Sequence, residues 1–182
     1  SDRPSPMLTD SHCHLGSHRF TDAELPGLVA RAREAGIHRL VTLATNLADI
    51  PTNLAIAERY EGVYACVGIH PCDVQDTPED YLGSLREFAG HPKTAAIGET
   101  GLDYFHPAPE GWSTEDYHQR QREFLKQHFE LAAELRLNVV IHTRDRKGDA
   151  SFADALAIYG PFSERVRDRK STRLNSSHTS IS

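Results

Sequence analysis

Two histidines near the start of the chain are spaced to act as a pair of metal ligands. They are His12 and His14 in the stretch DSHCHL, residues 10–15, with Cys13 between them. Residues two apart on a strand point to the same face, so both imidazoles would face one way and Cys13 the other. Neutral imidazole is the commonest metal ligand, and two on one face suit a divalent ion. Hydrogen bonding at a strand end is the simpler alternative for this pair taken alone.

A second candidate ligand is a glutamate that closes an apolar run. Glu99 stands in AAIGETGLDYF, residues 95–105, just before the turn-like pair Thr100 and Gly101. A buried carboxylate must be paired, protonated or metal-bound, because an isolated buried charge is costly. A salt bridge to a nearby arginine would satisfy a lone glutamate equally well. Asp103 and His106, slightly further on, are polar candidates without an assigned role.

Two more histidines follow short apolar runs. His142 comes after three apolar residues in NVVIHTRD, residues 138–145, and Arg144 lies two residues beyond it. His70 ends the run VGIHP, where Pro71 would stop a strand. A lone histidine in either position is more often structural than functional, so neither motif identifies a site by itself.

These side chains are set in a regular alternation of strand-like and helix-like segments. Short apolar runs predict strands over residues 7–15, 39–44, 63–69, 95–99 and 138–142. Amphipathic stretches predict helices over residues 22–35, 50–59, 78–88 and 114–135, with a further one near 151–159. Gly36 marks the expected end of the first helix, and Ser113 is a plausible N-cap for the helix over 114–135. That helix is the clearest, because Phe124, Leu125 and His128 fall near one face.

Alternation of strands and helices predicts a mainly parallel sheet, either doubly wound or closed as a TIM barrel. The sequence has neither a GxGxxG after the first strand nor a Walker-type phosphate loop, which removes the usual support for the doubly wound alternatives. The candidate ligands lie at the carboxyl ends of four predicted strands, and that rim is where a TIM barrel builds its active site. We therefore predict an incomplete TIM (β/α)8-type barrel, with about five βα units and a metal site at its rim.

Composition narrows the class of protein further. The 182 residues include 20 Lys and Arg against 26 Asp and Glu, a formal charge of −6, which argues against a broad basic surface for nucleic acid. Bound metal ions can nevertheless supply local positive charge. No apolar run is long enough to cross a membrane. Three cysteines without a CxxC pair suit a reducing compartment, so we predict a cytoplasmic protein.

The two ends of the chain differ from the rest. Residues 1–6 are read as a leader or cloning remnant, and residues 7–166 as the amino-terminal part of a TIM-barrel domain. Residues 167–182 are rich in serine and threonine and resemble a translated adapter more than a folded segment. We expect this tail to be non-native and disordered, and to supply neither a strand nor a packed helix.

Taken in order, the motifs DSHCHL, VGIHP, GETGLDYF and IHTRD closely resemble the TatD-type metal-dependent deoxyribonucleases, which are amidohydrolase-like TIM-barrel enzymes. The resemblance covers about residues 8–166. It implies that His12 and His14 bind one divalent ion, and that His142 binds a second. Glu99 would bridge the two ions and act in catalysis together with a metal-bound water.

The same resemblance implies that His70 and Arg144 contact a substrate phosphate. It also calls for a histidine after a sixth strand and an aspartate after an eighth. Neither is present, so the chain reads as C-terminally truncated and would carry four of six ligands.

The chemistry implied is hydrolysis of DNA phosphodiester bonds, because two divalent ions can activate a water and stabilise charge at phosphorus. Zn²⁺, Mn²⁺ and Mg²⁺ all fit mixed histidine and carboxylate ligands. Two ions bring four positive charges, whereas Glu99, a bridging hydroxide and the missing aspartate together contribute three negative ones. The pocket therefore stays positive and would attract a phosphodiester. The substrate would be single-stranded DNA or strand ends. We expect the protein to bind no membrane and to need no obligate protein partner.

Two alternatives stay open. HxH with a bridging acid would look the same in an amidohydrolase-type enzyme that cleaves small esters or amides. The chain could also be a non-catalytic fragment, inactive or weak by itself, because an unclosed barrel leaves strand edges exposed. Trp112, in the loop over residues 105–112, is read mainly as a cover for the next helix, with base stacking as the alternative.

Overall fold

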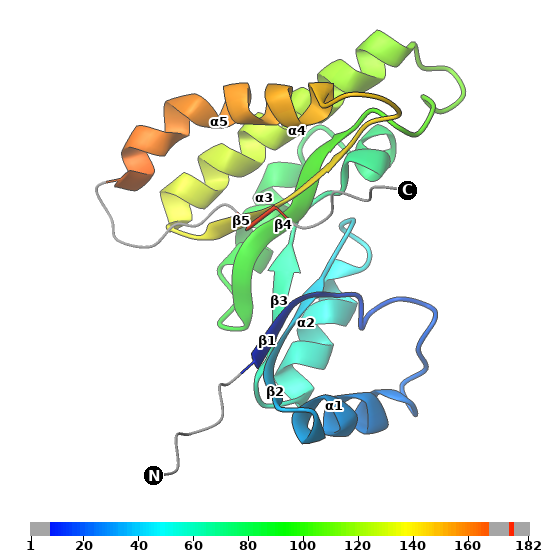
Figure 1. Ribbon diagram of the computed structural model, residues 1–182, viewed down its shortest axis with the longest axis vertical. Coiled ribbons are helices and arrows are strands. Elements are labelled where there is room, and N and C mark those ends of the chain that lie inside the picture. The colour runs from blue at the N-terminus through cyan, green and yellow to red at the C-terminus, as the bar shows by residue number, and fades with distance from the viewer. Residues whose placement is uncertain (1–7, 168–174, 177–182) are drawn as a thin grey trace.

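A computed structural model describes residues 8–167 and 175–176 of the chain (Figure 1). The strands are β1 (Leu8–Cys13), β2 (Ile37–Leu43), β3 (Val63–Val67), β4 (Thr94–Asp103), β5 (Asn138–Arg144) and β6 (Asn175–Ser176). The helices are α1 (Leu25–Glu34), α2 (Ile50–Arg59), α3 (Tyr81–Ala89), α4 (Thr114–Leu135) and α5 (Ala150–Arg167), with a 3-10 helix η1 (Pro71–Asp76) after β3.

The strands form one sheet in the order β1-β2-β3-β4-β5-β6, and every neighbouring pair is parallel. A doubly wound sheet reverses its order at a switch point, whereas a TIM barrel adds each strand beside the previous one. Helices α1 and α2 lie beside β1 and β2, and α4 and α5 lie together beside β4 and β5 (Figure 1). The chain is therefore an incomplete α/β barrel, which confirms the predicted fold class.

The core lies on both faces of this sheet. Ala65, Val67 and Ile97 belong to a large cluster that includes side chains from the helices. Their neighbours Cys66 and Ala96 belong to a small separate cluster that is completed by Leu43 and Val140. Successive residues of a strand point to opposite faces, so the small cluster occupies the inner face of the curved sheet and the large one the helix-covered outer face.

Helix α4 has the bounds that its sequence pattern predicts. The Ser113 hydroxyl oxygen accepts a hydrogen bond from the Asp116 amide at 3.1 Å, which satisfies one of the free N–H groups of the first turn. The helix ends at Leu135, and the backbone of the next residue, Arg136, is left-handed with a φ of 61°. Phe124, Leu125 and His128 on its inner face are buried. Helix α2 also matches its prediction at both ends.

Strand β4 differs most from the prediction, because it continues four residues past Glu99 to Asp103. The segment around Gly101 was expected to turn, but Gly101 pairs with His142 of β5 and has a positive φ of 142°, which residues other than glycine rarely adopt. A Cβ at this position would clash with the carbonyl oxygen of His142. Glycine is needed here for close approach of two strands, so Glu99 lies inside a strand and not at its end.

The remaining differences are small. Strand β2 begins at Ile37, two residues before its predicted start, and β5 continues to Arg144. The expectation that the tail supplies no strand is wrong at Asn175–Ser176, which pair with Val140 and Ile141. Residues 1–7 and the rest of the tail lie outside the described residues. Among those described, no helix is both long and apolar enough to span a bilayer.

Candidate metal centre

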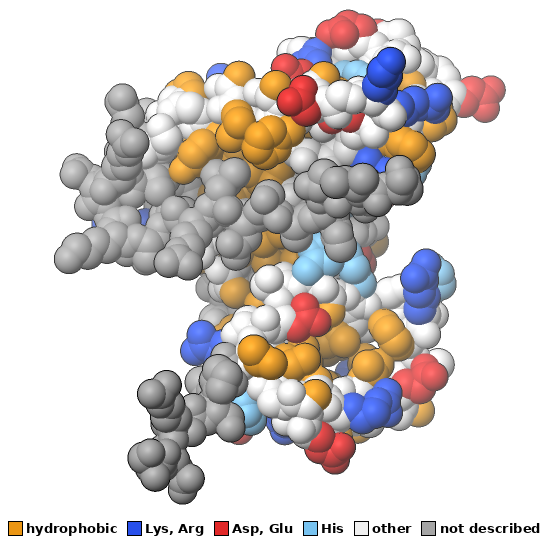
Figure 2. Space-filling model, viewed as in Figure 1, with side chains coloured by type: hydrophobic (Ala, Val, Ile, Leu, Met, Phe, Trp, Pro, Cys, Tyr) orange, Lys and Arg blue, Asp and Glu red, His pale blue; other side chains and the backbone are white. Residues whose placement is uncertain are grey.

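One cavity of about 420 Å³ collects every site residue that the sequence predicted. Histidine side chains gather in the hollow between the two parts of the visible face (Figure 2). The cavity is lined by the four proposed metal ligands, the two proposed substrate contacts and two further residues: His12, His14, Glu99, His142, His70, Arg144, Thr45 and Asp73. Segments far apart in the chain thus converge on one place, as a barrel rim requires.

The first half of the centre comes from β1 and the residue after it. The Nε2 atoms of His12 and His14 each lie 3.9 Å from Oε2 of Glu99. The two rings meet edge to face, with centroids 5.2 Å apart. His14 is held from behind, because its Nδ1 lies 3.3 Å from the Leu43 carbonyl oxygen, a hydrogen bond that leaves Nε2 to face Glu99. One ligand atom from each of the three residues falls within 4.8 Å of the others, which is close enough to share an ion.

The sulfur between these histidines takes no part in this group. Cys13 donates a hydrogen bond from its thiol to the Val41 carbonyl oxygen at 3.2 Å and packs against the core. Burial, together with the charge of Asp10, raises the pKa of the Cys13 thiol to about 12. The prediction that the two imidazoles face one way and the thiol the other is therefore confirmed.

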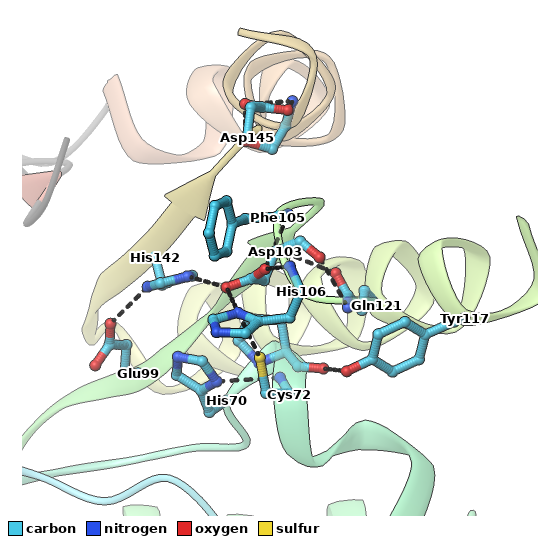
Figure 3. Close-up of polar contacts among 12 residues, drawn as sticks. His70, Cys72, Glu99, Asp103, Phe105, His106, Tyr117, Gln121, His142 and Asp145 are labelled. Atoms are coloured by element: carbon cyan, nitrogen blue, oxygen red, sulfur yellow. Dashed lines mark hydrogen bonds and ion pairs between the residues drawn. The ribbon is translucent and has the colours of Figure 1, made fainter. Parts of the chain in front are cut away.

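The second half of the centre is built by β5. Nδ1 of His142 lies 3.3 Å from Oε1 of Glu99, and its Nε2 lies 2.9 Å from Oδ2 of Asp103 (Figure 3). Glu99 is 3% exposed, and its two oxygens face different histidines: Oε2 faces the β1 pair and Oε1 faces His142. A carboxylate in this position can bridge two ions, one on each oxygen.

The charges in the centre support each other. Burial raises the pKa of Glu99, but the hydrogen bond with His142 and the positive charge of that ring lower it more, so the net pKa lies below its usual value. Burial lowers the pKa of His142, but hydrogen bonds with Asp103 and Glu99 raise it to about 9. Without an ion, His142 is therefore protonated at neutral pH and holds the two carboxylates together.

Asp103 is the residue whose role the sequence did not reveal. It is fully buried at the end of β4, and its Oδ1 accepts from the amides of Phe105 and His106 at 3.0 and 2.8 Å. Burial raises its pKa, but the hydrogen bonds from His142 and His106 bring the net pKa well below the usual range. Because it fixes His142 through Nε2, Asp103 is a positioning residue: a carboxylate behind a histidine orients that ring for metal binding. The strand was predicted to end at Glu99, so no strand end in the sequence marked Asp103.

His70 reaches the same cavity from the end of β3, but it differs from the other histidines in its protonation. Its Nδ1 accepts a hydrogen bond from the Cys72 amide at 3.0 Å. Burial, together with the charge on His142, lowers its pKa to about 4. The ring is therefore neutral, with its proton on Nε2. A nitrogen that carries a proton donates hydrogen bonds and does not bind an ion, although His70 lies close enough to Glu99 and His142 to share one.

Arg144, the last residue of β5, lies at the rim of the cavity. Its guanidinium stacks over the ring of Phe105 at 3.8 Å from the centroid. Trp112 does not line this cavity; its ring stands edge-on to Tyr117 of α4 at 6.3 Å, so it covers the helix as expected.

Two cavity residues were missed by the sequence reasoning. Thr45 follows the end of β2 by two residues, and the same strand-end rule that selected the histidines would have selected it. Asp73 lies in η1, three residues after His70. Burial, together with the charges of Asp49 and Asp76, raises the pKa of Asp73 to about 6. No periodic pattern in the sequence marks Asp73.

Comparison with known proteins identifies relatives of this chain. A family model described as TatD related DNase matches residues 9–167. The uncharacterized metal-dependent hydrolase YabD of Bacillus subtilis is 34% identical over 145 residues, which is 79% of this chain and 53% of YabD. The 3'-5' ssDNA/RNA exonuclease TatD of Cronobacter sakazakii is 32% identical over 159 residues, 87% of this chain and 56% of the relative.

Solved structures agree with these relatives. The crystal structure of YJJV, a TatD homolog from Escherichia coli, superposes with a TM-score of 0.69 at 27% identity, covering 85% of this chain and 57% of that one. A TatD family hydrolase from Entamoeba histolytica superposes with a TM-score of 0.70 at 18% identity and so supports the fold alone, over 87% of this chain and 55% of that one. The chain spans about half the length of the curated relatives it matches.

Proposed function

This chain belongs to the TatD related DNase family, whose relatives include metal-dependent hydrolases, and we propose that its parent protein hydrolyses phosphodiester bonds of DNA. By parent protein we mean the protein that contains these residues. The proposed reaction is exonuclease-type cleavage of single-stranded DNA or strand ends. The name of the Cronobacter relative, which describes an exonuclease on single-stranded DNA and RNA, supports this class of substrate.

The observation that carries the proposal is the orientation of Glu99. One of its oxygens faces His12 and His14 and the other faces His142, so one buried carboxylate joins two groups of imidazoles. A structural salt bridge would need only one partner and would not require ligand-type atoms on both sides. We therefore propose two divalent ions, with Glu99 shared between them.

The donor set fits such ions. Imidazole nitrogen and carboxylate oxygen are ligands for Zn²⁺ and Mn²⁺, and Mg²⁺ accepts the carboxylate. His12 and His14 would hold one ion and His142 the other. When bound, a metal pair supplies an activated water and stabilises negative charge on the attacked phosphoryl group. The carbonyl of Leu43 and the carboxylate of Asp103 keep His14 and His142 in orientation for this role.

Substrate contacts are proposed for the two remaining cationic or donor groups of the cavity. The Nε2–H of His70 is a neutral hydrogen-bond donor, suited to a phosphate oxygen. The Arg144 guanidinium adds a positive charge at the rim and can pair with phosphate in two hydrogen bonds. Local charge of this kind explains how a protein fragment with a net charge of −6 could hold DNA.

A nuclease assay tests the proposal. The parent protein, loaded with Mn²⁺, should release nucleotides from end-labelled single-stranded DNA, and a chelator should stop the release. E99Q should abolish turnover, because an amide cannot bridge two ions as a carboxylate does. E110Q, in an exposed loop, is the matched control and should keep full activity. Labels at the 5' and 3' ends distinguish the direction of cleavage.

Turnover of small esters or amides without release of nucleotides would overturn the proposal in favour of an amidohydrolase-type enzyme. The 182-residue chain alone is expected to be inactive or weak, because the family pattern includes a histidine and an aspartate beyond the four ligands found here. Reading the parent gene past Val166 for these two residues tests that expectation. We also propose a cytoplasmic location, on the ground that Cys13, Cys66 and Cys72 are all free thiols.

A further inference from the structure

A second group of ligand-type atoms lies behind His142, on the side away from Glu99 (Figure 3). It consists of the Cys72 sulfur, an Asp103 carboxylate oxygen and the His106 Nδ1 atom, which all fall within 4.8 Å of one another. Nδ1 of His106 is 3.0 Å from Oδ2 of Asp103 and 3.8 Å from Sγ of Cys72. The paired-ion centre does not use Cys72 or His106.

These separations match those within a tetrahedral metal site. With metal–sulfur bonds of about 2.3 Å and metal–nitrogen or metal–oxygen bonds of about 2.0–2.2 Å, neighbouring ligand atoms lie roughly 3.3–3.6 Å apart. The two measured distances fall within about 0.3 Å of that range. An ion could therefore enter with only small side-chain movements.

The three residues come from separate parts of the fold that are held firmly. Cys72 lies in the first turn of η1, Asp103 ends β4, and His106 lies in the loop that follows. Asp103 is fixed by backbone amides and by Gln121 of α4, whose side-chain oxygen accepts from the Asp103 amide at 2.8 Å. The side chain of His106 is 49% exposed, so an ion could reach the group from solvent.

We propose that Cys72, Asp103 and His106 form a third metal site, which binds a thiophilic divalent cation such as Zn²⁺. A thiolate and a carboxylate carry two negative charges, so a divalent ion with a neutral imidazole leaves the site uncharged next to the buried Asp103. Soft thiolate ligands select ions such as Zn²⁺ over Mg²⁺ or Mn²⁺. The fourth position would go to water, which is the arrangement of an open site.

The third site shares Asp103 with the paired-ion centre. Oδ2 of Asp103 also accepts the hydrogen bond from His142 at 2.9 Å. An ion at the third site would draw charge from this carboxylate and make it a poorer partner for His142. Occupancy of the third site and binding at His142 are therefore linked through one side chain.

Cobalt spectroscopy tests the proposal. Co²⁺ replaces Zn²⁺ in such sites, and a Co²⁺ ion bound to a thiolate shows a sulfur-to-metal charge-transfer band that histidine and carboxylate ligands do not give. Metal-free parent protein titrated with Co²⁺ should show this band, and C72S should lose it. C13S and C66S remove the other two cysteines of this chain and should keep it. H106A should weaken Co²⁺ binding at this band, whereas H18A, an exposed histidine elsewhere, should not.

Two outcomes would overturn the site: no charge-transfer band in the wild-type protein, or a band that persists in C72S. Either would mean that the group is held by hydrogen bonds alone. X-ray absorption at the zinc edge gives a check that does not depend on a variant folding, because a bound sulfur should appear at about 2.3 Å. The double variant H12A/H14A should keep the band, so loss of nuclease activity and loss of this site are separate results.

Discussion

Acid should weaken the fold through His128, a buried residue that links helix α4 to the cavity. His128 is fully buried, its Nε2 accepts from the Ile69 amide at 3.0 Å, and its Nδ1 donates to the Phe124 carbonyl at 2.6 Å. Ile69 directly precedes His70, so this hydrogen bond holds the end of β3 in place. A protonated ring could not accept from Ile69.

The size of the effect follows from the pKa of His128. Burial lowers it from 6.5 to about 4, despite the hydrogen bond to Phe124, which raises it. The unfolded chain therefore takes up a proton before the folded protein does. Stability is fully present above pH 6.5 and falls as the pH drops towards 4. The loss is about 3 kcal/mol in total and about 2 kcal/mol at pH 5.

Urea unfolding at pH 7 and pH 5 measures this contribution. H128Q removes the titrating ring but keeps a side-chain oxygen that can accept from Ile69. Between pH 7 and pH 5, the free energy of unfolding of the wild-type protein should fall by about 2 kcal/mol more than that of H128Q. Other titrating groups, such as Asp103 and Glu99, are common to both proteins and cancel in the difference. H18Q, at an exposed histidine, should behave as wild type. Equal losses in wild type and H128Q would refute the reasoning.

Three further predictions concern the metal centre and the sheet. D103N should weaken Mn²⁺ binding at His142 by about 10–100-fold, measured by calorimetry, because the ring loses its carboxylate partner. D80N, which changes an exposed aspartate, should have no effect. Unchanged affinity in D103N would contradict the positioning role. Because His142 has a pKa of about 9 without metal, an ion that binds this ring must displace its proton. The Mn²⁺ affinity at His142 should therefore rise from pH 6 to pH 9, with release of about one proton for each ion bound there. Calorimetry in buffers of different ionisation enthalpy measures that release, and none would argue against His142 as a ligand. G68A places a Cβ 2.7 Å from Cα of Gly98 and should lower the free energy of unfolding by about 1–3 kcal/mol. G83A, in α3 with open space around it, should raise the free energy of unfolding by about 0.5–1 kcal/mol. If urea unfolding gave G68A and G83A the same stability, the β3–β4 contact would not be tight.

Local patterns were sufficient for most of the helices and strands and for selecting the candidate ligands that line the cavity. The bounds of α2 and α4 follow from apolar spacing and from the cap at Ser113, because these features act within one helix. His12 and His14 were selected by their spacing of two residues at the end of a predicted strand, and His142 by its place after an apolar run. Parallel strands bring such ends to one edge of the sheet, so position along each strand was enough to bring them together.

The errors arose where the outcome depends on contacts between distant segments. Gly101 suggested a turn, but pairing with β5 extends the strand to Asp103. The role of Asp103 depends on His142, which lies 39 residues away. Likewise, the tautomer of His70 is set by the Cys72 amide, and no sequence pattern contains that hydrogen bond.

A crystal of the parent protein grown with Mn²⁺ and measured for anomalous scattering tests the central claim most directly. Mn²⁺ prefers nitrogen and oxygen ligands, so it does not report the Cys72 group. The account predicts two anomalous peaks that share Glu99: one beside His12 and His14 at Oε2, and one beside His142 at Oε1. A single peak, or two peaks that do not both contact Glu99, would contradict it.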